Sequence, residues 1–205
     1  KNNIYLIGGT IPEKDDNKIY NTCFIFDKNG NIVSKYRKMH LFDIDIPKKI
    51  RFLESDVLTA GSDLTLIDTE ICKIGIAICY DMRFSEIFRI MALAGAQIIL
   101  APASFNMITG PLHWELLIKS RALDNQIFFG ACSTARSNKS EYVSYGNSMI
   151  CDPWANIVAK GGFGEEIIYG EIDLSKNLKY RSELPLIKHR RKDLYSIKYK
   201  STGIY

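Results

Sequence analysis

The stretch KIGIAICYDMRFSEIFRIMALAGAQIILAPA, residues 73–103, decides the fold. It opens with an apolar run, 73–79, and closes with a second one, 97–103, both typical of buried strands. Between them, over 85–96, apolar residues recur with helical spacing. Strand, helix and strand in this order predict a parallel βαβ unit, since parallel strands need a crossover connection.

Short β-type runs recur outside this unit, at 4–9, 21–26, 31–38, 64–68, 127–133, 147–152 and 166–173. The pair Asn29-Gly30 lies between two of them and predicts a tight antiparallel hairpin. A second helix is predicted over 113–126 from its apolar face. Parallel and antiparallel pairing together predict an α/β fold with mixed sheets, in one domain over residues 1–205.

Composition narrows the class of protein. With 46% hydrophobic and 24% charged residues, the 205-residue chain has the balance of an ordinary globular domain. The net charge of +4 comes with no basic face or nucleic-acid module, so no nucleic-acid partner is expected. No apolar run is long enough for a membrane helix. The five cysteines, scattered without a CxxC pair, predict a reduced protein without a zinc site, located in the cytoplasm.

Cys79 ends the first apolar run, and Ser85 is the expected N-cap of the following helix. Backbone N–H groups at such a turn favour a thiolate and stabilise a developing oxyanion. The arrangement is similar to the nucleophile elbow of hydrolases, with cysteine in place of serine. A buried structural cysteine explains the same apolar run, and the sequence of this turn alone leaves both readings open.

A second stretch, KYRKMHLFDID at 35–45, places Lys38 before an apolar loop that should pack inward. A lysine held near a thiol favours the thiolate and stabilises negative charge on a tetrahedral intermediate. The loop therefore makes Lys38 a second candidate catalytic residue.

Together, YRKMHLFD (36–43) and GIAICYDMRFSE (75–86) resemble the lysine and cysteine motifs of the nitrilase superfamily, the carbon–nitrogen hydrolases. The resemblance implies a four-layer α-β-β-α sandwich, a homodimer or higher homo-oligomer, and a Glu-Lys-Cys triad that needs no metal or organic cofactor. It implies that Cys79 is the nucleophile, that Lys38 is the triad lysine, and that Glu54 orients this lysine.

The motifs are most similar to those of the omega-amidases, which hydrolyse the terminal amide of alpha-ketoglutaramate or succinamate through a cysteine thioester and release ammonia. The resemblance implies that the backbone N–H of Tyr80 helps to bind the oxyanion and that Arg83 binds the carboxylate at the far end of the substrate. Further substrate contacts are expected from Phe105, Met107 and Thr109. On local charge alone, Arg83 fits a structural ion pair with Asp81 or Glu86 equally well.

In this family the general-base glutamate precedes the strand that opens this sequence. The chain is therefore expected to be N-terminally truncated, without the first strand, the first helix and the base, and a mitochondrial location stays open. Glu13, expected in a polar turn, matches no family base, and His113 is interpreted as a supporting imidazole. Two alternatives remain: an amidase for deaminated glutathione or an N-carbamoyl amide, and a binding protein without catalysis.

Overall fold

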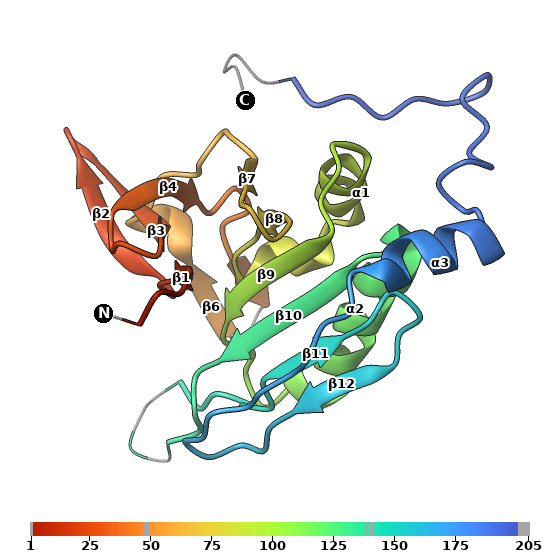
Figure 1. Cartoon of the computed structure of the whole chain (residues 1–205). Helices are drawn as coiled ribbons and strands as arrows, with labels where there is room; N and C mark the ends of the chain where they lie inside the picture. Colours follow the sequence, from red (N-terminus) through yellow and green to blue (C-terminus); the bar gives the residue numbers. More distant parts are fainter. Residues whose placement is uncertain (1, 47–49, 138, 140–141, 201–205) are drawn as a thin grey trace. The chain divides into compact units, whose positions relative to one another are not determined.

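The computed structural model describes residues 2–46, 50–137, 139 and 142–200 (Figure 1). Residues up to Thr65 form one compact unit, and residues from Leu66 to Lys200 form a second. None of the helices in these described ranges has the length and hydropathy needed to cross a membrane.

The first unit is built around strand β3, Lys18–Phe26, which pairs antiparallel with β1, β2 and β4. These strands span Leu6–Ile7, Ile11–Asp15 and Ile32–Arg37. The turn between β3 and β4 confirms the predicted hairpin: Gly30 has a φ of +87°, and Asp27 Oδ1 accepts the backbone N–H of Asn29 at 2.8 Å. Cys23, Ile25 and Tyr36 are fully buried on one face of this sheet.

A second hairpin in this unit joins β5, Asp43–Ile46, to β6, Ile50–Leu53, and leads into the 3-10 turn η1, Glu54–Asp56. The sequence analysis expected an apolar loop after Lys38, within the stretch 35–45, and missed the strand that begins there at Asp43. Each strand has only four residues, and only β5 alternates charged with apolar side chains, which is too short for a periodic signal.

Glu13 is also placed differently from the expected polar turn: it lies in the middle of β2, opposite Tyr20 of β3. Its carboxylate accepts both Nε and Nη2 of Arg37, at 2.8 and 2.9 Å, and the Nζ of Lys35 at 2.5 Å. Thr22 donates its hydroxyl to the same group at 2.8 Å. The hydrogen bonds from Arg37, followed by those from Lys35 and Thr22, lower the pKa of Glu13 to about 2.

We expect Glu13→Gln to lower the free energy of unfolding at pH 7 by about 2 kcal/mol, the scale of hydrogen bonds to a charged group. Because the folded state depresses the pKa of Glu13 from 4.5 to about 2, its stabilisation is complete above pH 4.5 and is lost as the pH falls toward 2. Chemical denaturation between pH 7 and pH 2.5 should therefore show a steeper acid loss in the parent than in the variant. The exposed Glu165→Gln is the matched control, and equal acid profiles for parent and Glu13→Gln would contradict the prediction.

The second unit contains a mixed sheet whose strands follow the order β12-β11-β10-β9-β8-β7 in the described chain. The strands span Thr65–Asp68 (β7), Lys73–Ile76 (β8), Ile98–Ala103 (β9), Phe128–Ser133 (β10), Met149–Cys151 (β11) and Ile157–Lys160 (β12). Strands β8, β9 and β10 are parallel, which confirms the predicted βαβ unit, whereas β11 pairs antiparallel with both β10 and β12.

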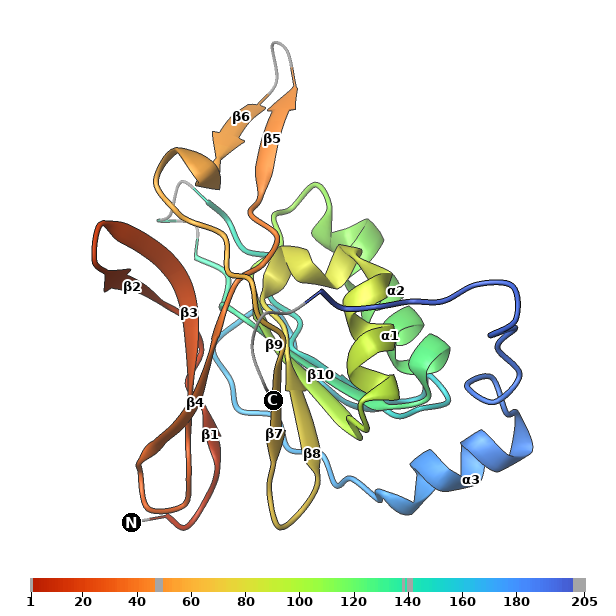
Figure 2. The ribbon, with the colours of Figure 1, turned by 90° about the horizontal axis from the view of Figure 1, so that it is seen from above.

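Helices α1, Ser85–Leu93, and α2, Gly110–Asn125, connect the parallel strands and lie side by side on one face of this sheet (Figure 2). Phe88 and Met91 of α1 and Trp114 and Ile118 of α2 are almost completely buried. Ser85 is the first helical residue and not the N-cap, since the chain is still extended at Phe84 and no side chain caps the helix. This shift of one residue is common at helix ends.

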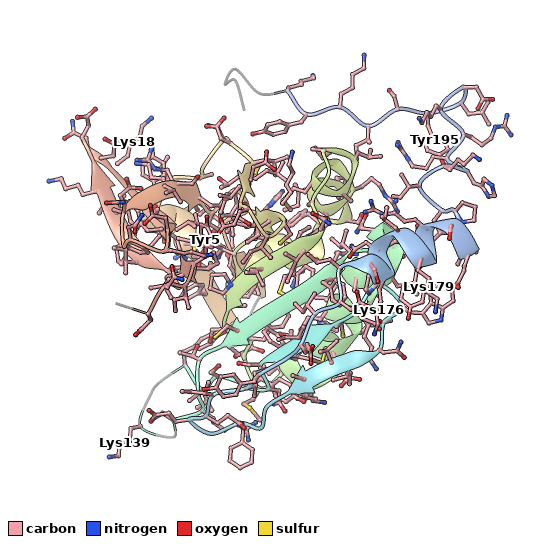
Figure 3. All side chains as sticks on the ribbon, viewed as in Figure 1. Tyr5, Lys18, Lys139, Lys176, Lys179 and Tyr195 are labelled. Atoms are coloured by element: carbon pink, nitrogen blue, oxygen red, sulfur yellow. The ribbon has the colours of Figure 1, made fainter. Side chains whose placement is uncertain are left out.

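A third helix, α3, spans Ser175–Glu183 and was not predicted, because its sequence SKNLKYRSE lacks an apolar stripe. Lys176 and Lys179 extend from it in Figure 3, and Asn177 is its buried residue. Asn177 holds the helix to the rest of the unit by donating to the carbonyls of Gln97 and Gln126, at 3.0 and 3.3 Å.

The predicted strand over 166–173 was wrong. Within the described chain these residues take part in no strand, and Ile167 and Tyr169 are 78% and 85% exposed. An apolar run forms a strand only where a neighbouring backbone completes its hydrogen bonds, and the run alone does not reveal such a neighbour.

Candidate active site

Lys38 follows directly after β4 and is almost completely buried, with 1% of its surface exposed. Its backbone is fixed on both sides, because its N–H donates to Asn21 O at 2.9 Å and its carbonyl accepts from Gly61 N at 2.8 Å. Its Nζ donates to Glu54 Oε2 at 2.6 Å. The structure thus brings together two of the residues that the motifs single out.

The β5–β6 hairpin explains how residues 16 positions apart meet. At its base the N–H of Glu54 donates to the carbonyl of Phe42 at 3.3 Å, and the N–H of Phe42 donates to Glu54 Oε2 at 2.9 Å. The Glu54 side chain is 16% exposed, so it is not the ordinary surface acid that its local sequence suggests. Its carboxylate is held by a buried ammonium and a backbone amide.

Cys79 begins the 3-10 turn η2, Cys79–Arg83, three residues after β8 ends. Its φ is +46°, a conformation that non-glycine residues rarely adopt and that is common at functional sites. The carboxylate of Asp81 accepts the N–H of Ile78 at 2.9 Å, which fixes the entry into the turn. Cys79 is half-buried, and its Sγ lies 3.3 Å from the carbonyl oxygen of Ser104, to which it donates.

These features give the second unit a strained turn that presents a thiol next to a short helical segment. Tyr80 follows in the first turn of η2, where backbone N–H groups point toward the N-terminal end. Such N–H groups stabilise an oxyanion when one forms nearby. This local geometry agrees with the elbow that the sequence predicts.

The other cysteines have different surroundings. Burial raises the pKa of Cys23 and of Cys151 to about 11, and burial also raises the pKa of Cys72. Cys132 is exposed on β10. The buried thiols are therefore poor nucleophiles at neutral pH.

Arg83 ends η2 and is half-buried. Its Nη1 lies 3.1 Å from Nδ1 of His113, and its guanidinium lies over the ring of Phe105 at 4.9 Å and near the ring of Tyr80 at 5.9 Å. Among the described residues its contacts include no carboxylate, so neither of the ion pairs that local charge allows is formed.

The remaining predicted contact residues lie on the segment between β9 and α2. Phe105 is buried and packs edge-to-face against Trp114, with ring centroids 5.2 Å apart. Met107 is exposed. Thr109 donates its hydroxyl to Asn106 Oδ1 at 3.1 Å, and the same oxygen accepts the N–H of Thr109 at 2.8 Å. This Asn side chain closes the turn at the start of α2.

Two residues near the thiol escaped the sequence analysis. The hydroxyl of Tyr142 donates to Ser104 O at 2.9 Å, the carbonyl that also accepts from Cys79 Sγ. Ser144, which is buried, accepts a hydrogen bond from Ser104 Oγ at 3.1 Å. No pattern in the sequence distinguishes these residues from ordinary loop positions.

The predicted residues fall into two groups. Lys38 and Glu54 belong to the first unit, whereas Cys79, Tyr80, Arg83, Phe105, Met107 and Thr109 belong to the second. In the part of the chain that the structure describes, no three His, Cys, Asp or Glu side chains are grouped so that they could hold a metal ion.

The chain is similar to several known proteins. A human protein named omega-amidase NIT2 is 48% identical over 197 residues, which cover 96% of this chain and 71% of the relative. The crystal structure of Saccharomyces cerevisiae Nit3, a nitrilase superfamily member, matches 92% of this chain and 67% of its own, with a TM-score of 0.85 and 47% identity.

The Caenorhabditis elegans NitFhit structure matches 98% of this chain with a TM-score of 0.91 and 38% identity, over 50% of its own length. These likenesses confirm the mixed α/β, nitrilase-like fold class that the motifs predict. The model of the carbon–nitrogen hydrolase family matches residues 1–181. The chain belongs to the carbon–nitrogen hydrolase family.

Proposed function

We propose that this chain is the omega-amidase type of carbon–nitrogen hydrolase, releasing ammonia from the terminal amide of a small ω-amide such as alpha-ketoglutaramate or succinamate. The similarity to proteins named omega-amidase supports this substrate class. The main structural support for this substrate class is the position of Arg83. This half-buried cation lies on the same short turn as Cys79 and forms no ion pair among the described residues. A substrate carboxylate supplies the missing partner, and a guanidinium binds it with two parallel hydrogen bonds.

In the proposed reaction the Cys79 thiol loses its proton to a general base, and the thiolate attacks the amide carbon. The resulting oxyanion accepts hydrogen bonds from Lys38 Nζ and the Tyr80 N–H. The base then passes the proton to the leaving nitrogen, the C–N bond breaks, and ammonia departs. Water, deprotonated by the same base, attacks the thioester and frees the carboxylic acid and the Cys79 thiol.

Among the described residues, neither Glu54 nor Glu13 fits the role of the general base. Glu54 is engaged with Lys38 and with the Phe42 amide. Glu13 is bound by Arg37 and Lys35, and its pKa of about 2 makes it a weak proton acceptor at neutral pH. The resemblance to the family implies that the base is a glutamate before the strand at 4–9, and this assignment is part of the proposal. A homo-oligomer, a cytoplasmic location and a single domain over 1–205 also remain predictions.

Arg83→Lys tests the carboxylate assignment. Lysine keeps the charge but not the planar pair of donors, so the KM for succinamate should rise about tenfold or more. Propionamide, which lacks the distal carboxylate, should be hydrolysed with a nearly unchanged kcat/KM. Steady-state ammonia release by the natural full-length protein measures both.

The matched control is Arg89→Lys on α1, where the arginine donates to the Asp124 carbonyl. It should leave both substrates unaffected. An equal loss for succinamate and propionamide in Arg83→Lys would make Arg83 structural and remove the main support for the omega-amidase assignment. Absence of ammonia release from every amide in the parent protein would favour the binding-protein alternative.

A further inference from the structure

We infer that His113 is a positioning residue that sets the direction of the Arg83 guanidinium, and through it the affinity for the substrate carboxylate. The inference rests on the proposed function of Arg83. It concerns a residue on α2, 30 positions from Arg83 in the sequence.

The hydrogen bond between the two side chains has a defined polarity. A guanidinium carries only donors, so at 3.1 Å the His113 Nδ1 must accept from Arg83 Nη1. The imidazole in this contact is therefore neutral, with its proton on Nε2. One N–H of the guanidinium is used by His113, and the remaining N–H groups have no hydrogen-bond partner among the described residues.

Helix α2 also fixes the backbone of Arg83. Arg121, which is 7% exposed, donates its Nε to Met82 O at 2.9 Å and its Nη2 to Arg83 O at 3.3 Å. His113 and Arg121 are eight residues apart, which places them on one face of the helix. A single rigid helix thus holds both the main chain and the side-chain end of Arg83.

The aromatic contacts alone do not determine the orientation of the guanidinium. Phe105 and Tyr80 attract it through the faces of their rings, an interaction with little dependence on rotation in the guanidinium plane. The hydrogen bond to His113 supplies this missing restraint. A two-point contact with a carboxylate needs the correct orientation, and an arginine that must first be ordered loses side-chain entropy on binding.

The experiment compares His113→Phe, which keeps a planar ring without the acceptor, with His113→Asn, whose Oδ1 can occupy the place of Nδ1. In the natural full-length protein, His113→Phe should raise the KM for succinamate roughly 5- to 10-fold, the scale of one ordinary hydrogen bond. Its kcat should change less than about twofold, because the bond acts on binding and not on the chemical step. His113→Asn should restore most of the affinity, and propionamide turnover should be unaffected by either change.

A double-mutant cycle separates this inference from the proposed function. In an Arg83→Lys background, His113→Phe should have almost no further effect on succinamate, because the group that it orients is absent. If Arg83→Lys spares propionamide but His113→Phe leaves the succinamate KM unchanged, the inference is wrong and the proposed function stands. If Arg83→Lys affects both amides equally, the proposed function itself fails.

The same kinetic measurements also test whether the role of His113 is merely structural. An equal loss of kcat/KM for both amides in His113→Phe, not rescued by asparagine, would overturn the positioning role. If the phenylalanine variant does not fold, His113→Ala replaces it, since alanine favours the helix and removes the same acceptor. The same KM rise is expected, and an unchanged KM would again refute the inference.

Discussion

Cys79→Ala is expected to lower amide hydrolysis at least about 10⁴-fold, because no other group forms the covalent intermediate. Cys79 has a φ of +46°, and alanine adopts this left-handed conformation at about the same cost as cysteine. The variant should therefore fold as the parent does. Ammonia release from succinamate, together with the thermal unfolding midpoint, separates loss of chemistry from loss of structure. Substantial activity in Cys79→Ala would end the nucleophile assignment.

Alkylation gives an independent measure of the same assignment. Iodoacetamide should modify Cys79 faster than the other cysteines of the folded full-length protein, and mass spectrometry of the peptides reports each rate. Cys23 and Cys151 should react slowest, since burial raises their pKa to about 11. Cys132 is the critical comparison because it is exposed and lies outside the turn. A Cys132 that reacts as fast as Cys79 would show that exposure, and not activation, controls labelling.

The strongest sequence patterns predicted the parts of the fold that local rules determine. The βαβ unit over 73–103 has both strands apolar and a helix with a clear stripe, and the Asn29-Gly30 turn demands a positive φ. Helix α3 lacks such a signal, since its buried residue is Asn177, held by hydrogen bonds to carbonyls far away in the sequence. The local sequence of a helix or strand does not reveal its stability when that stability comes from hydrogen bonds to residues far away in the chain.

In the candidate site, too, the parts that are contiguous in the sequence were predictable, whereas the contacts between distant residues were not. The cysteine turn was recognisable because strand end, thiol and helix start are contiguous in the sequence. The contact between Lys38 and Glu54 depends on the β5–β6 hairpin, and the contact between Arg83 and His113 depends on how α2 packs against η2. The family motif, rather than any local property, singled out Glu54. Nothing in the local sequence indicated that Tyr142 and Ser144 both form hydrogen bonds with Ser104, the residue whose carbonyl also accepts from the thiol.

Lys38→Met is expected to lower kcat/KM about 10²-fold or more, the effect of losing one oxyanion donor. Methionine fills much of the volume of the buried lysine stem, which limits the cavity that alanine would leave. Lys14→Met on the exposed surface of β2 is the matched control and should leave kcat/KM unchanged. A parent-like kcat/KM in Lys38→Met would remove Lys38 from the proposed mechanism.

Glu54→Gln completes this test, because Glu54 is proposed to act through Lys38. Glutamine can still accept the Phe42 N–H, but it leaves the buried ammonium without its carboxylate, which costs several kcal/mol of folding free energy. We therefore expect Glu54→Gln to be less stable than the parent and about tenfold or more less active, since the ammonium is no longer held in place. In the double variant Lys38→Met/Glu54→Gln, stability should recover because no buried charge is unpaired, whereas kcat/KM should fall no further than in Lys38→Met alone. Additive losses in kcat/KM would mean that Glu54 contributes to the reaction independently of Lys38.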